Sequence, residues 1–302
     1  MMNSHLVRML IGVGVLASAA CSVDVGGEQA VLNEEKRFPV QGKVDLTLST
    51  SDGSIEVRSW DRNEVSVRIE RRAATAQEAE ALEVQTTQEG NRIVVDAPRR
   101  SRARTSTRDS FHIGVWRSPT VSFIVSLPRQ VTLAAKTGDG SITAGDLAGA
   151  INLQTGDGSI RVDRVEGEVT AHTGDGSIDI VDARGRADLE SGDGSIRITG
   201  RLDGLRTHSG DGSVHAEASD GSAMKTDWSL TTGDGSITLL LPASFDADVD
   251  AQSGDGAVRA EGISSVSTSG DGDRNASRGR LGKGGHTLRV RSGDGGIDIR
   301  TR

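Results

Sequence analysis

The segment that decides the fold is residues 137–180, TGDGSITAGDLAGAINLQTGDGSIRVDRVEGEVTAHTGDGSIDI, in which a Thr-Gly-Asp-Gly-Ser-Ile motif begins at Thr137, Thr155 and Thr173. The tripeptide Gly-Asp-Gly begins at nine positions: Gly138, Gly156, Gly174, Gly192, Gly210, Gly233, Gly254, Gly270 and Gly293. The first five copies are evenly spaced, and the later copies follow at uneven intervals. A constant short period is typical of stacked repeats. Because Asp-Gly favours tight turns, we expect a corner at each copy, with glycine taking a positive φ.

Apolar residues alternate with polar ones between these corners. In the first repeat Ile142 and Ala144 are followed by Ile151 and Leu153, and a period of two indicates short strands. A second set of glycines lies midway between the corners, at Gly149, Gly167, Gly185 and Gly204. One such unit cannot bury its apolar side alone, whereas stacked units can. The sequence therefore predicts an all-β fold, a β-solenoid of roughly 18-residue coils with Gly-Asp-Gly corners, whose strands, about 4.8 Å apart, form a rod about 40 Å long.

The chain divides into four predicted regions. We expect a lipoprotein-type signal peptide at residues 1–20, a tether at 21–36, an irregular N-terminal β region at 37–131 that caps the stack, and the β-solenoid at 132–302. Period-two patterns predict strands in the N-terminal region at residues 44–48, 54–57, 65–69, 93–95 and 121–125. A capping-box pattern at Thr75 and Glu78 predicts one short helix, which continues to Leu82.

The start of the chain resembles that of a bacterial lipoprotein. A basic residue precedes an apolar run at residues 9–20 that is too short to span a bilayer. Small residues then lead to Cys21, the only cysteine, and this join is similar to a lipobox, although Ser18 replaces the usual large aliphatic residue. We expect Cys21 to be lipidated and to anchor the protein to the cell envelope, with Ser22 favouring the outer membrane, on its periplasmic or surface face. Ordinary secretion with a free thiol is the alternative.

Composition argues against several classes of function. The formal net charge of -8 offers no basic footprint, so we expect no nucleic-acid partner. Aromatic residues make up 2% of the chain, which leaves few platforms on which sugar rings could stack. None of the six histidines lies in a metal-ligand spacing or a nucleophile motif, so we predict no catalytic residues and no enzymatic activity. A polysaccharide-acting β-helix enzyme is the less favoured alternative.

The nine motif aspartates are the main candidate site. If successive coils keep the same register, these aspartates form a column: Asp139, Asp157, Asp175, Asp193, Asp211, Asp234, Asp255, Asp271 and Asp294. Carboxylates about 4.8 Å apart repel by about 1 kcal/mol in water, so this repulsion must be compensated. Bonds from corner amides and from hydroxyls such as Ser141 or Ser159, in an Asx-type turn, are the favoured interpretation. The alternative is a row of calcium ions, although the repeat departs from the known calcium-binding β-helix motif. No other metal or cofactor is predicted.

A basic run separates two of the predicted strands. It contains Arg99, Arg100, Arg102, Arg104 and Arg108. Most runs of this kind are solvated loops, which is the interpretation we favour. The alternative is contact with anionic headgroups of the anchoring membrane, where each charge contributes about 1 kcal/mol.

The combined pattern resembles the bacterial putative adhesin family, a domain of unknown function, from about Phe38 to the end of the chain. The resemblance rests on the lipoprotein-like start, the β-rich leader, the Leu127-Pro128 and Leu241-Pro242 pairs before extended strands, and the repeated Thr/Ser-Gly-Asp-Gly-Ser-Ile motif. It implies a β-solenoid fold and an envelope location, and it brings no catalytic residues.

We therefore expect a non-catalytic envelope lipoprotein that acts as an adhesin or as a surface-binding scaffold. Its expected partners are the membrane, through the lipid anchor, and a surface, protein or glycan ligand that the sequence does not identify. A self-assembling structural β-helix is the alternative. The charged C-terminal residues 298–302 argue against it, because charges on an edge strand discourage strand addition.

Overall fold

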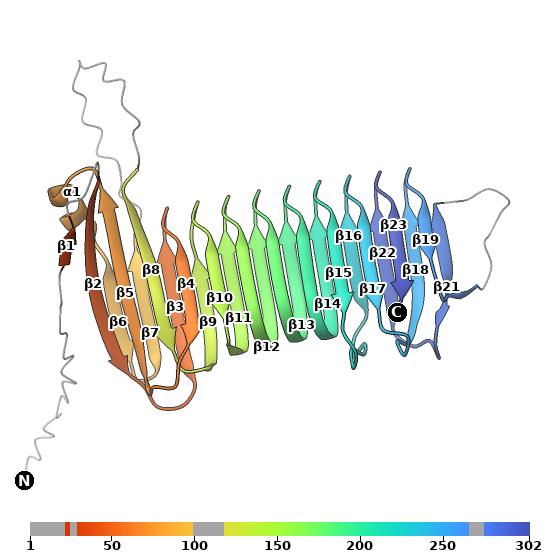
Figure 1. Cartoon of the computed structure of the whole chain (residues 1–302), viewed down its shortest axis with the longest axis horizontal. Helices are drawn as coiled ribbons and strands as arrows, with labels where there is room; N and C mark the ends of the chain where they lie inside the picture. The colour runs from red at the N-terminus through yellow and green to blue at the C-terminus, as the bar shows by residue number, and fades with distance from the viewer. Residues whose placement is uncertain (1–21, 25–28, 99–117, 266–274) are drawn as a thin grey trace, which may run out of the picture.

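The computed structural model describes residues 22–24, 29–98, 118–265 and 275–302, which form one long stack of strands (Figure 1). Apart from the helix α1 (Ala76–Glu80), every regular element among these residues is a β-strand, which confirms the predicted all-β class. None of the described residues belongs to a helix that is long and apolar enough to cross a membrane.

In the middle of the chain each coil pairs in parallel with the next coil of the sequence, so that Ile160 lies beside Ile178. β10 and β11 both pair with β12, β12 pairs with β13, and β13 pairs with β14. The bounds are β10 (Ile142–Gly145), β11 (Ala148–Thr155), β12 (Ile160–Thr173), β13 (Ile178–Ser191) and β14 (Ile196–Ser209). Where the offset between paired residues equals the period of the motif, the same positions face inward in successive coils; between β13 and β14 the register shifts after Ile180 and again after Gly185.

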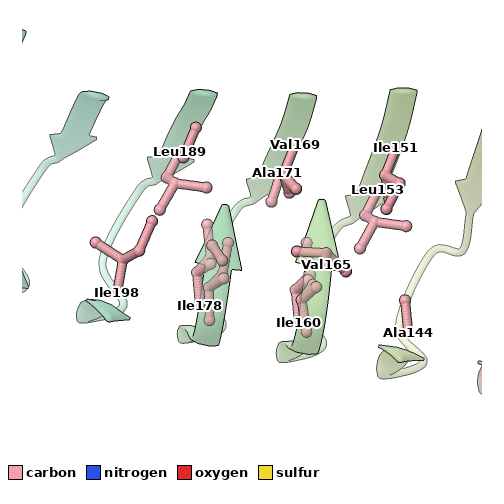
Figure 2. Close-up of a cluster of buried hydrophobic side chains, with 14 of the residues drawn as sticks. Ala144, Ile151, Leu153, Ile160, Val165, Val169, Ala171, Ile178, Leu189 and Ile198 are labelled. Carbon is pink, nitrogen blue, oxygen red and sulfur yellow. The ribbon is translucent and has the colours of Figure 1, made fainter. Parts of the chain in front are cut away.

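The interior is a set of aliphatic columns. Figure 2 shows Ile160, Ile178 and Ile198 on one side of the stack, opposite Leu153 and Leu189 on the other. All five are at most 2% exposed. Complete burial of such a side chain stabilises the fold by about 1.5–3 kcal/mol. The few aromatic residues are therefore no obstacle to a core, because the coil is flat enough for two opposing aliphatic layers to fill it.

The Gly-Asp-Gly corners require glycine for a reason other than the expected one. None of the glycines in the described corners has a positive φ, so that part of the prediction is wrong. A Cβ on Gly158 would lie 2.0 Å from the carbonyl oxygen of Gly140 in the preceding coil. Positive φ occurs instead at three of the glycines midway between the corners, Gly149 (134°), Gly167 (123°) and Gly185 (121°), but not at Gly204. The main corner thus needs glycine because successive backbones approach too closely for any side chain.

We predict that Gly176→Ala lowers the free energy of unfolding by at least about 2 kcal/mol, because its Cβ would lie 2.0 Å from the Gly158 carbonyl oxygen. Gly145→Ala is the matched control in the same stack, since its Cβ would meet no atom closer than the Asp163 carbonyl oxygen at 3.5 Å. Urea unfolding followed by circular dichroism measures both. Equal effects of the two substitutions would contradict the close-approach explanation.

The stack begins earlier than residue 132. β3 (Val44–Thr50) and β4 (Ile55–Ser59) form a coil that pairs in parallel with β9 (Gln130–Lys136) and β10. Its corner carries Asp52 but has Ser51 where the other corners have their first glycine, and the Gly138 amide donates to the Ser51 carbonyl oxygen at 2.7 Å. The sequence signal was present, because residues 52–55 read Asp-Gly-Ser-Ile as in the repeat.

Antiparallel strands cover the N-terminal end of the stack. β5 pairs antiparallel with both β2 and β8, and β6 pairs antiparallel with β7. The bounds are β1 (Ser22–Asp24), β2 (Ala30–Pro39), β5 (Glu64–Ala73), β6 (Gln85–Glu89), β7 (Arg92–Ala97) and β8 (Thr120–Leu127). β1 and most of β2 lie within the predicted tether at 21–36 and pair antiparallel, so these residues are part of the sheet. The predicted helix is confirmed, with the Thr75 side chain accepting from the Glu78 amide at 3.2 Å, although it ends at Glu80.

The C-terminal coils do not follow the order of the sequence. β22 and β23, the last two strands, lie between the coil of β16 and β17 and the coil of β18 and β19 (Figure 1). The bounds are β15 (Val214–Ala218), β16 (Trp228–Thr232), β17 (Ile237–Leu241), β18 (Ala247–Ser253), β19 (Val258–Ala260), β20 (Ser264–Ser265), β21 (Ala276–Leu281), β22 (Thr287–Ser292) and β23 (Ile297–Thr301). Asp298 therefore has Thr238 and Arg259 beside it, and the expectation that the charged C-terminus forms an edge is wrong.

A half-buried carboxylate holds the inserted coil in place. Arg291 on β22 donates to both the carbonyl oxygen and the carboxylate of Asp250 on β18, and Arg278 on β21 donates to the same carboxylate at 3.1 Å. Burial opposes ionisation of Asp250, but the hydrogen bonds from Arg291 and Arg278 outweigh it, so its pKa lies below the ordinary value of 3.8. Three strands are thus joined through one side chain.

We predict that Asp250→Asn lowers the free energy of unfolding by about 1–2 kcal/mol at neutral pH. Because the pKa is lower in the folded state, the carboxylate stabilises the fold above the unfolded pKa, and this stabilisation is lost as pH falls through the folded pKa. The difference between wild type and variant should therefore shrink below about pH 4. Urea unfolding across this range tests it, with Asp188→Asn as the control because Asp188 approaches Arg206 only to 4.0 Å. A difference that does not change with pH would contradict the assignment.

Candidate functional site

The corner edge of the stack presents one aspartate and usually one serine from each coil. We call these exposed side chains the Asp–Ser ridge. In spatial order its aspartates are Asp139, Asp157, Asp175, Asp193, Asp211, Asp234, Asp294 and Asp255, and its serines are Ser141, Ser159, Ser177, Ser195, Ser213 and Ser236. Asp271 lies outside the described residues. The structure thus brings eight of the nine predicted aspartates to one edge, and it adds Asp52 and Ser54 at the N-terminal end.

Beneath the ridge runs a buried hydroxyl column that fastens each corner to the one before it. Thr173, 0% exposed, accepts from its own corner's Gly176 amide at 3.2 Å and donates to the Gly158 carbonyl oxygen at 2.9 Å. The donation to the neighbouring coil recurs at every member of the column: Thr137, Thr155, Thr173, Ser191, Ser209, Thr232, Ser292 and Ser253. The Thr/Ser position of the motif is therefore structural.

This hydroxyl column changes the role of the aspartates. We expected the corner amides to donate to the Asp carboxylates. Where the amide of the second corner glycine does bond to a side chain, it donates instead to the Thr or Ser that precedes the corner, as at Gly158 and Gly194. The eight ridge carboxylates named above make no hydrogen bond or ion pair with any other described residue, and all eight are exposed. They therefore face solvent and are available to a ligand.

We predict that Thr173→Val destabilises the fold by about 1–3 kcal/mol, because it leaves the Gly176 amide and the Gly158 carbonyl without their buried partner. Thr173→Ser should retain most of the stability, since Ser191 and Ser209 make the same pair of bonds. Thermal unfolding of the two variants checks this. If valine were tolerated as well as serine, the hydroxyl would have no structural role.

The electrostatics of the ridge favour a cationic or hydrogen-bonding partner. Stacked carboxylates about 4.8 Å apart repel by about 1 kcal/mol in water, and salt screens exposed charges further. Among the described residues no group of three or more His, Cys, Asp or Glu side chains is placed to hold a metal ion. Because calcium takes about six to eight oxygen ligands, one carboxylate and one hydroxyl per coil would have to be shared between neighbouring coils.

Two other predicted sites lie outside the described residues. These are the lipidation site Cys21 and the basic run of Arg99, Arg100, Arg102, Arg104 and Arg108. Two histidines that precede corners are exposed: His172 Nδ1 lies 3.4 Å from Glu190 Oε2, and His208 Nδ1 lies 2.9 Å from Thr231 Oγ1.

Comparison with known proteins gives a family match over most of the chain. Residues 44–300 match the family model described as Toastrack DUF4097. A structure of a putative cell adhesion protein from Clostridium sporogenes aligns with 89% of this chain and 100% of its own, at 14% identity and a TM-score of 0.28. A structure of a putative adhesin from Bacteroides fragilis aligns with 89% of this chain and 97% of its own, at 11% identity and a TM-score of 0.42. A search of curated proteins finds no match.

Proposed function

Because this chain belongs to the Toastrack DUF4097 family, we propose that it is a non-catalytic binding protein of the cell envelope, a β-solenoid that presents the Asp–Ser ridge to a surface partner. The partner is a protein or glycan surface, and nucleic acid is disfavoured by the net charge of -8. No chemical step is assigned to the protein.

The observation that supports this proposal best is the regularity of the ridge. Each coil sets one exposed carboxylate, and in most coils one exposed hydroxyl, at the same place on a stack whose register is fixed from within. Short contacts join neighbouring serines of the ridge, as between Ser177 and Ser159 at 3.3 Å. A rigid row of identical groups suits a repetitive partner, because many weak contacts with one surface add up without a deep pocket.

The anchoring part of the proposal rests on the sequence. A lipid on Cys21 would hold the chain in the envelope, and Ser22 favours the outer membrane. The capping strands β1 and β2 follow the anchor in the chain and lie at one end of the stack (Figure 1). The stack would then extend away from the membrane, with the ridge running along its length.

Two comparisons in cells that express the full chain test the proposal. Cys21→Ser should move the protein from the membrane fraction to the soluble fraction. The triple variant Asp157→Asn, Asp175→Asn, Asp193→Asn should reduce attachment of these cells to glycan- or matrix-coated surfaces by about tenfold, because it neutralises three adjacent ridge carboxylates. Its control is Glu80→Gln, Glu83→Gln, Glu89→Gln, which removes the same charge from exposed positions away from the ridge.

The effect of calcium distinguishes a ridge that binds its partner through shared calcium ions from one whose carboxylates contact the partner directly. If ridge carboxylates share calcium ions, millimolar calcium should raise the thermal midpoint of the full chain relative to chelator, and the Asp157, Asp175, Asp193 variant should lose that rise. An unchanged midpoint assigns the ridge to direct contact with the partner. Attachment that is the same for wild type, ridge variant and Glu control would refute a binding role for the ridge.

A further inference from the structure

A cavity lies on the strands that lead into the corners. It lies where the even spacing of the corners ends, between Gly210 and Gly233. The extra residues form an irregular segment, 219–227, between β15 and β16. The cavity beside it has a volume of about 390 Å³. This volume is at the lower end of the range for small-molecule sites and is larger than a single inorganic anion needs. The cavity is therefore large enough for a sugar-sized ligand.

Three arginines from three different strands line the cavity: Arg186 on β13, Arg206 on β14 and Arg289 on β22. Ser229 lies beside Arg206 on one side and Arg289 on the other in the strand register. The two arginines are thus two strand spacings apart, about 10 Å along the stack, on the same face. Side chains of that length can both reach an anion held above Ser229.

The three arginines differ in how their charge is compensated. Arg289 makes no hydrogen bond or ion pair with any described residue. Arg186 and Arg206 form long, exposed ion pairs, with Glu168 at 3.8 Å and Asp188 at 4.0 Å. Exposed pairs at these distances are weak. The unpaired guanidinium of Arg289, beside two weakly paired arginines, favours an anionic partner.

The acidic residue in the lining is already engaged. Asp227 accepts from the Thr287 amide at 2.9 Å, and its Oδ1 lies 3.4 Å from His286 Nδ1. It therefore orders the wall of the cavity. Hydroxyls of Thr226, Ser229 and Thr287 complete the polar lining.

Two neighbours of the cavity are tightly packed. A Cβ on Gly204 would lie 3.1 Å from Arg186 Cγ and 3.4 Å from Thr226 Oγ1, so glycine at this position lets the Arg186 side chain lie close to the backbone. Trp228 borders the cavity, but its side chain is 0% exposed and packs against Phe245 in the core.

From these contacts we infer that the cavity lined by Arg186, Arg206 and Arg289 binds a sugar residue that carries an oxyanion group. Guanidinium groups pair with carboxylate, sulfate and phosphate oxygens through charge-assisted hydrogen bonds, and the hydroxyls of the lining suit the sugar. The site lies away from the Asp–Ser ridge and has the opposite charge, so it does not depend on the function proposed for the ridge.

Calorimetric titration of the purified full chain tests this inference. The probes are glucose 6-phosphate, glucose 6-sulfate, glucuronate and inorganic phosphate, with glucose as the neutral control, in a low-salt buffer without competing oxyanions. At least one anionic sugar should bind with a dissociation constant below about 10 mM, and glucose should not bind. The order of the three anionic sugars identifies the preferred oxyanion.

Arg289→Gln should weaken that binding at least about tenfold, because it removes the lining cation that has no partner among the described residues. Arg197→Gln is the matched control, since Arg197 is an exposed arginine away from the cavity and should leave binding unchanged. The inference is overturned if no anionic sugar binds wild type, if glucose binds equally well, or if Arg289→Gln and Arg197→Gln bind alike.

Discussion

The fold depends on how closely successive corner backbones approach one another. At each corner the second glycine sits against the carbonyl of the coil before it, at a separation that leaves no room for a Cβ. The buried hydroxyl that precedes the corner bonds to that same carbonyl, as Thr173 does to Gly158. The close approach and the hydrogen bond involve the same carbonyl oxygen. The corner therefore sets the register of the strands on either side of it, and this register aligns the aliphatic side chains into columns.

Charged side chains on the strand faces reinforce this register. Arg161 lies 3.6 Å from Asp179 in the next coil, and Arg186 lies 3.8 Å from Glu168 in the coil before it. Opposite charges directly across neighbouring strands contribute about 0.2–1 kcal/mol each, whereas like charges in those positions would oppose the pairing. These exposed pairs are weak individually. Their consistent placement disfavours a slip by one residue, which would also turn the aliphatic columns toward solvent.

The same register governs where ligands can bind. The regular part of the stack offers repeated surface groups such as the Asp–Ser ridge. A hollow forms where the repeat is interrupted, at residues 219–227, and there Arg186, Arg206 and Arg289 line one cavity. Regularity thus favours extended, multivalent contact, and its interruption favours recognition of a single chemical group.

The strands, the corners, the inward columns and the capped helix could be predicted from local sequence, because each depends on the alternation of apolar residues, on the Asp-Gly repeats or on the Thr75 cap. The order of the C-terminal coils follows from the tertiary structure alone, and so does the lack of partners among the described residues for the eight ridge carboxylates from Asp139 to Asp255. The reason is physical. Every coil presents nearly the same edge to its neighbours, so local pattern cannot say which coil lies beside which. Contacts such as Asp250 with Arg291 make that choice.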